Sequence, residues 1–222
     1  MPICKCPIES ELPSIGNVEC PESFGQIQKV AFANLNGAPF FLSKDGSEIP
    51  DGEKRNIVKK TAWTAKLADS SDEKIIISPY IEAPTADGGA ARTFGGGNET
   101  LGGIEVIIGR EPTSFSGVFR MIPQTIIKKL KAMQCISYTD SLGVFLFDEN
   151  GSIGGILTVL DSVAYDAVSP IPIRSLFFGD KTLGGLEAPD SNAVQWSFLP
   201  NWSDDLVIVA PEFNPLTDLK NA

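Results

Sequence analysis

The chain has 222 residues, no histidine, four cysteines and a formal net charge of −10 at pH 7. Without histidine it has no Ser-His or Cys-His nucleophile and lacks the commonest metal ligand, so we expect a non-catalytic protein that needs no cofactor. The acidic balance argues against tight, sequence-independent binding to phosphate backbones, and no apolar run approaches the roughly 20 residues that cross a bilayer. The acidity fits either a solvated surface or a surface that repels nearby nucleic acid.

Residues 1–23 contain four prolines and no hydrophobic periodicity, which predicts an extended N-terminal arm without a signal peptide. Three cysteines, Cys4, Cys6 and Cys20, lie in this segment. Their thiolates could bind zinc, but no fourth ligand is near and the spacing differs from the paired Cys-x₂-Cys of zinc ribbons. Reduced free thiols are the favoured interpretation, and no metal site is predicted.

Residues 24–215 are predicted to form a single β domain, and residues 216–222 a C-terminal tail. Short alternating or apolar segments between turn residues are typical of strands. Residues 56–66 remain ambiguous between a short helix and a strand around Trp63. The expected strands cover residues 26–32, 39–42, 75–77, 104–108, 115–121, 144–148, 153–160, 171–178, 193–199 and 206–210.

One convincing helix is expected at about residues 123–134, because proline is favourable at the first helical position. Ile122, Ile126, Leu130 and Met133 recur at helical spacing and form one apolar stripe, with Ile127 beside it. Such a stripe predicts a helix that packs on a sheet. The fold class is therefore mainly β, an antiparallel sandwich or barrel with one packed α-helix.

Two long loops are expected, at about residues 44–60 and 83–103. The second is glycine-rich, but it ends in Gly97-Asn98-Glu99 rather than the Gly-Lys-Ser/Thr of a phosphate-binding loop. Long loops in compact domains are often binding elements, so a loop or hairpin tip that contacts a partner is the favoured interpretation. The candidate assembly residues are Gly88, Gly89, Arg92, Phe94, Gly96 and Asn98.

Two tryptophans near the C-terminus are candidates for the core or for an interface. Trp196 alternates with Phe198 and is predicted to be buried. Trp202 follows a Pro-Asn turn and fits either the core, which is favoured, or a contact between subunits. Adjacent carboxylates such as Asp204-Asp205 point to opposite faces of a strand, so no catalytic residue is predicted.

Residues 104–156 resemble virion proteins of tailed bacteriophages, above all tail tube proteins. The similar pieces are a strand, the crossing segment PTSFSGVFRMI, the helix PQTIIKKLKAM and the hairpin ISYTDSLGVFLFDENGSIGG. The closing segment, IRSLFFGDKTLGGLEAPDSNAVQWSFLPNWSDDLVIVAP, is similar to the end of such proteins from phages of gut Bacteroidetes. These patterns cover about half of the chain.

The resemblance implies a tail-tube-like β-sandwich that forms stacked hexameric rings around an acidic DNA channel. Residues 83–103 or 44–60 would bridge successive rings, and residues 122–134 would form the flanking helix. The partners would be further copies and other virion proteins, with DNA only as non-specific cargo, and no membrane. The protein would reside in the virion after assembly in the host bacterial cytoplasm.

Two alternatives stay open. One is another ring, head-tail or baseplate component of a virion. The other, from a different class, is a carbohydrate- or cell-surface-binding β module in which Tyr80 and Trp202 would line a groove. Open sheet edges would favour assembly, and protected edges would favour the binding module.

Overall fold

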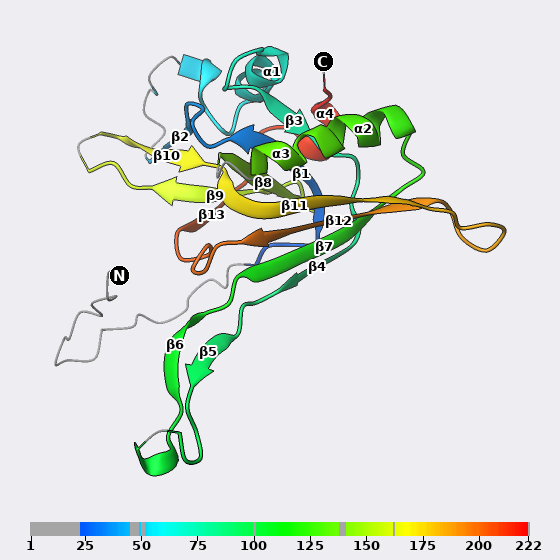
Figure 1. The fold of residues 1–222 in the computed structure, drawn as a ribbon. Helices are drawn as coiled ribbons and strands as arrows, with labels where there is room; N and C mark the ends of the chain where they lie inside the picture. Colours follow the sequence, from blue (N-terminus) through cyan, green and yellow to red (C-terminus); the bar gives the residue numbers. More distant parts are fainter. Residues whose placement is uncertain are drawn as a thin grey trace.

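The structure is a computed structural model that describes residues 23–44, 49, 52–99, 101–137, 141–161 and 163–221. The three N-terminal cysteines lie outside these residues. The fold is mainly β and antiparallel, which confirms the predicted class (Figure 1). Its strands are β1 (Ile27–Asn34), β2 (Phe40–Ser43), β3 (Ile75–Ile77), β4 (Glu82–Asp87), β5 (Ala91–Phe94), β6 (Val106–Arg110), β7 (Thr113–Arg120), β8 (Leu142–Asp148), β9 (Ile153–Thr158), β10 (Tyr165–Ser169), β11 (Ile171–Thr182), β12 (Ser191–Phe198) and β13 (Leu206–Val209).

The strands form one curled sheet and one separate ribbon. Neighbouring strands follow the order β2-β10-β9-β8-β11-β12-β7-β4, while β1, β3 and β13 attach to the side of this path and β5 pairs only with β6. Strand β11 begins beside β8, where Ile171 is the partner of Val144, and then pairs with β12 from Ile173 onward. It therefore joins two layers that fold over one another as a sandwich.

The layer around β1 and β8 is buried on both faces, because successive side chains on a strand point to opposite sides. All seven residues of β8 are buried. One face contributes Val30, Phe32, Val144 and Leu146 to the core between the layers. The other face contributes Ala31, Ala33, Phe145 and Phe147 to a second core.

Helix α1 (Lys60–Ala68) covers this second core. Trp63 is fully buried, stacks on Phe40 with ring centroids 4.5 Å apart, and donates its Nε1–H to the carbonyl oxygen of Ile57 at 2.9 Å. The ambiguous segment around Trp63 is thus helical, and α1 is a second packed helix that hydrophobic periodicity does not predict. The reason is that one large aromatic side chain anchors α1, which has no strong apolar periodicity of its own.

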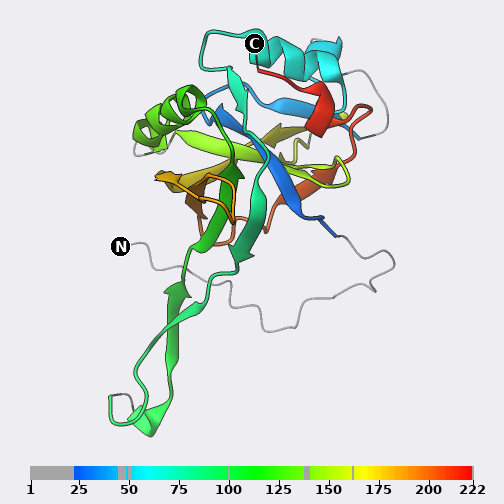
Figure 2. The same cartoon turned by 90° about the vertical axis from the view of Figure 1, so that its right-hand side faces the viewer.

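The helix predicted at about residues 123–134 is present as α2 (Gln124–Ala132), followed by α3 (Gln134–Ser137) (Figure 2). The side of α2 that packs on the core differs from the prediction. Ile127, Leu130 and Met133 are buried, whereas Ile126 is 41% exposed. The helix is rotated so that Ile127, which the predicted stripe left to one side, faces the sheet. No helix in the described ranges is long and apolar enough to cross a membrane.

The C-terminal residues pack against the body rather than forming a tail. Helix α4 (Pro215–Asp218) begins at Asn214, whose side chain accepts a hydrogen bond from the Leu216 N–H. Leu219 is only 3% exposed and belongs to the second core. Residues 216–221 of the predicted C-terminal segment therefore lie against the body, where Leu219 and Asn221 contact it.

Candidate assembly site

A long antiparallel hairpin leaves the body of the protein (Figure 1). Near the body, β4 pairs with β7; further out, β5 pairs with β6, with Phe94 opposite Val106. We call residues 88–111, the outer part of this hairpin, the arm. The predicted loop at residues 83–103 is therefore mostly one side of a paired ribbon and its turn, including the short 3₁₀ segment η2 (Leu101–Gly103). The other predicted loop, residues 44–60, contains the 3₁₀ segment η1 (Gly52–Lys54) in its described part.

The arm exposes apolar side chains to solvent on both faces. Phe94, Val106, Ile107 and Ile108 are each between 53% and 69% exposed. Phe94 and Val106 are register partners and share a face with Ile108, while Ile107 lies on the other face. An isolated two-stranded ribbon is marginally stable in water, and contiguous exposed apolar side chains mark interaction sites. The arm thus has the properties of a segment that another protein surface covers.

The candidate residues of the sequence analysis lie at different levels of the arm. Arg92 and Phe94 lie on β5, and Gly96 and Asn98 lie in the distal turn, where Gly96 has a φ of +108°. Gly88 and Gly89 lie at the base. A Cβ atom on Gly89 would stand 1.9 Å from the carbonyl oxygen of Glu111, so the two sides of the hairpin approach each other too closely there for a side chain.

Sequence reasoning missed the contribution of β6 to this site. The apolar run 104–108 is expected to be a strand, and its residues 106–108 lie in β6, but an apolar run of this kind is typical of a buried strand. Here β6 is exposed at every position except the partly buried Gly109. The available signal was the position of this run directly after Gly102-Gly103, which couples it to the glycine-rich segment as the return side of one hairpin.

The base of the arm is held by hydrogen bonds around Thr113. Its hydroxyl oxygen accepts the indole N–H of Trp202 at 3.1 Å and the backbone N–H of Gly89 at 3.3 Å. The Trp202 ring stacks on Phe198 with centroids 4.5 Å apart, and Arg110 donates to the Asn201 side-chain oxygen at 2.8 Å. Trp202 therefore contacts its own subunit, where it connects the arm to the core.

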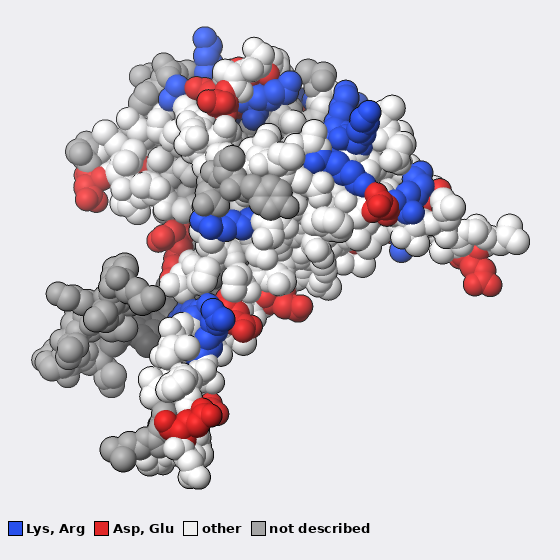
Figure 3. Space-filling view, in the orientation of Figure 1, with Lys and Arg blue, Asp and Glu red and all other residues white. Residues whose placement is uncertain are grey.

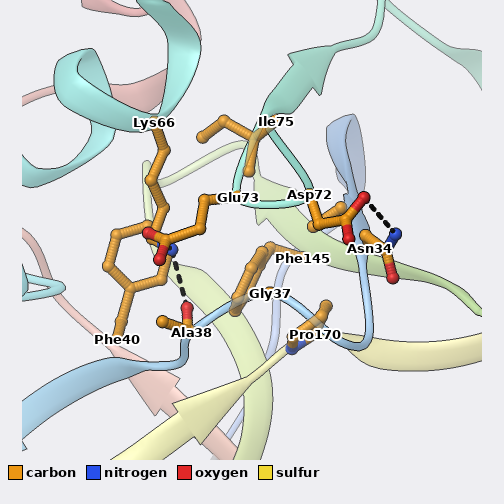
Figure 4. Close-up of a pocket in the computed structure, with 11 residues that line it drawn as sticks. Asn34, Gly37, Ala38, Phe40, Lys66, Asp72, Glu73, Ile75, Phe145 and Pro170 are labelled. Atoms are coloured by element: carbon orange, nitrogen blue, oxygen red, sulfur yellow. Dashed lines mark hydrogen bonds and ion pairs between the residues drawn. The ribbon is translucent and has the colours of Figure 1, made fainter. Parts of the chain in front are cut away.

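A buried lysine, Lys66, lies beside the second core, on helix α1 (Figure 4). Lys66 is 6% exposed and donates to the Ala38 carbonyl oxygen at 2.6 Å and to Glu73 at 3.3 Å. Burial lowers the pKa of Lys66, while the Glu73 carboxylate acts in the opposite direction. The adjacent cavity measures about 10 Å³, which is room for one water molecule. Lys66 thus connects α1 to the turn before β2.

Within the part of the chain that the structure describes, no three His, Cys, Asp or Glu side chains come close enough together to hold a metal ion. No protein-family model and no curated protein matches the chain. Among solved structures, the chain is similar to one in the cryo-EM structure of the anti-feeding prophage baseplate, symmetrised six-fold. The match covers 87% of this chain and 99% of that chain, at 7% identity and a TM-score of 0.32. A likeness at this level assigns no function.

Proposed function

We propose that the chain is a structural subunit of a phage-type particle, and that it acts by assembling with further copies and with other particle proteins rather than by catalysis. The single observation that carries the proposal is the arm. Its apolar side chains belong to neither core of the subunit, so they gain burial only from a partner.

The architecture supports the proposal because it separates a rigid body from a projecting contact element. The body has two cores and a layer buried on both faces, which a scaffold needs in order to hold the arm in a fixed direction. Trp202 and Thr113 fasten the base of the arm to this body. A hairpin fixed at its base and free at its tip is suited to reach a neighbouring subunit.

The finer assignment is a tail tube protein that forms stacked hexameric rings around DNA. Its support is the resemblance of residues 104–156 and of the closing segment to tail tube proteins, together with the net charge of −10, which suits a channel through which DNA moves without adhering. A ring, head-tail or baseplate component is the alternative within the same class. We further propose the virion as its location, after assembly in the host cytoplasm.

The proposed carbohydrate-binding alternative loses its two aromatic candidates to contacts within the subunit. Trp202 stacks on Phe198 at the base of the arm. Tyr80 lies under the ammonium group of Lys29, 4.0 Å from its ring centroid, and its hydroxyl approaches the Leu216 carbonyl oxygen at 3.4 Å. Both rings thus contact their own subunit, although Tyr80 remains 49% exposed.

The test compares the full chain with a variant whose arm is shortened. Arg92 and Gly109 are register partners, so residues 93–108 can be replaced by Asn-Gly, which closes a two-residue hairpin. Light scattering over a concentration series and negative-stain images should show rings or tubes for the full chain and monomers for the variant. Circular dichroism should show that both are folded. Equal assembly of the two proteins would overturn the proposal.

A further inference from the structure

A groove of about 550 Å³ lies between α2, β3 and the C-terminal segment. Its apolar lining includes all four residues of the predicted helical stripe: Ile122, Ile126, Leu130 and Met133. This explains why Ile126 is exposed although it belongs to that stripe. The stripe borders an open groove, and Ile127 makes the core contact in its place.

The groove has a basic rim. Lys29, Lys74, Lys129 and Lys220 line it, and no aspartate or glutamate does. Lys29 is engaged, because it donates to the Leu216 carbonyl oxygen at 2.6 Å. The other three lysines are exposed and take part in none of the ion pairs formed between described residues. An apolar floor with three available ammonium groups suits an apolar and acidic occupant.

The distal part of the arm has this complementary chemistry. Residues 93–109 contain Glu99 and Glu105 and carry the exposed Phe94, Val106, Ile107 and Ile108. The arginines of the arm, Arg92 and Arg110, lie nearer the body, where Arg110 donates to Asn201. Figure 3 shows acidic side chains near the tip of the arm and basic side chains gathered over α2.

The arm and the groove lie at opposite ends of the subunit. In two perpendicular views, the arm extends downward while α2, β3 and the C-terminus lie at the top (Figures 1 and 2). The arm therefore cannot fill the groove of its own subunit. A contact between two different surfaces of identical subunits repeats from copy to copy and builds a ring or a stack.

We infer that the groove between α2, β3 and the C-terminal segment receives the arm of a second copy of this chain. This inference rests on the proposed assembly function and adds the receiving surface to it. The apolar arm residues lie on the floor formed by Ile76, Ile122 and Ile126, and Glu99 and Glu105 pair with the lysines of the rim. The outer edge of β3 at Ile77 is covered by Asn221, so the contact uses side chains rather than an added strand.

Charge reversal on each side tests the contact. The groove variant carries Lys74→Glu and Lys129→Glu; the arm variant carries Glu99→Lys and Glu105→Lys. Each variant alone should self-associate at least ~10-fold more weakly than the wild type, because like charges then face each other. An equimolar mixture should assemble, because each arm then meets a groove of opposite charge. Lys128→Glu, on the same helix but outside the groove lining, is the matched control and should assemble like the wild type.

The readout is sedimentation velocity with negative-stain images, and circular dichroism confirms folding of each variant. Full assembly of the groove variant, with loss of assembly in the arm-shortened protein, would overturn the inference and leave the assembly function standing. The inference would also be overturned if the wild type and the equimolar mixture of the two variants were both monomeric. Residues 1–22, which include Glu9 and Glu11, are a competing occupant. Loss of assembly on their deletion, with unchanged assembly of the arm variant, would assign the groove to them and overturn the inference.

Discussion

Asn221 forms two hydrogen bonds with the backbone of Ile77, 144 positions earlier in the chain. Its side-chain oxygen accepts the Ile77 N–H at 2.8 Å, and its side-chain nitrogen donates to the Ile77 carbonyl oxygen at 2.8 Å. The amide of one side chain therefore takes the place of a neighbouring strand along β3. It pairs the backbone groups of Ile77, which would otherwise be unpaired at this edge of the sheet.

Replacing Asn221 with alanine should lower the free energy of unfolding by about 1–2 kcal/mol, because both backbone groups of Ile77 lose their partner in a partly buried position. Urea denaturation followed by tryptophan fluorescence measures this. Lys220→Ala, at the exposed neighbouring position, is the control and should leave the stability unchanged. Equal stability of Asn221→Ala and the wild type would show that water replaces the amide without cost.

Gly89→Ala should lower the free energy needed to open the base of the arm by about 1–3 kcal/mol. The reason is that its Cβ atom would collide with the Glu111 carbonyl oxygen. The Glu111 N–H donates to the Ala90 carbonyl oxygen at this level, so its hydrogen exchange should accelerate. Gly88→Ala is a matched control, since a Cβ atom there meets nothing within 4 Å. Similar exchange rates in the two variants would contradict the close approach of the two sides.

Phe94→Ser combined with Ile108→Ser should prevent assembly without changing the stability of the subunit, because both side chains are exposed on the arm and belong to neither core. Light scattering and thermal denaturation separate these two effects. Val159→Ser, which replaces an apolar side chain that is 61% exposed and outside the arm, is the control. A large loss of stability in the variant with Phe94→Ser and Ile108→Ser would place these residues in the folded core.

The pH dependence of stability should report the buried Lys66. Burial lowers its pKa below the ordinary lysine value of 10.5. Between the lowered pKa and 10.5, the unfolded chain holds a proton that the folded chain has lost, so this group makes stability rise with pH. Below the lowered pKa both states are protonated, and the dependence vanishes.

Lys66→Met removes this group, so the free energy of unfolding of the wild type relative to the variant should rise between about pH 8 and about pH 10. Urea denaturation at both pH values measures the difference. Lys60→Met, at the exposed start of the same helix, is the matched control. A constant difference between wild type and Lys66→Met would show that Lys66 remains charged in the folded protein across this range.

The sequence predicts most of the sheet because alternation and apolar runs report burial directly. Strands β7 and β12 are examples: their residues alternate between buried and less buried positions along most of their length. Strand β10, with the sequence YDAVS, was missed because its burial does not alternate. Strand β4 was missed because prolonged exposure leaves no hydrophobic pattern, so only its pairing with β7 defines it.

The candidate site was predictable in location but not in form. Glycine content marked residues 88–98 as a contact element, yet the same glycines concealed that β5 is a paired strand. The helical stripe at Ile122, Ile126, Leu130 and Met133 was visible, but periodicity cannot distinguish a face against the core from a face along an open groove. That distinction depends on how far β3 and the C-terminal segment stand from α2.

The continuity of β11 has a consequence for how the subunit loses its structure. One strand of 12 residues belongs to both layers of the sandwich, with β8 at its beginning and β12 along the rest, where its register shifts between Arg174 and Phe177 and between Phe178 and Lys181. Neither layer can melt while the other keeps all of its strands. Heating should therefore give a single calorimetric peak for the body of the protein, and a fragment ending before Ile171 should recover neither layer.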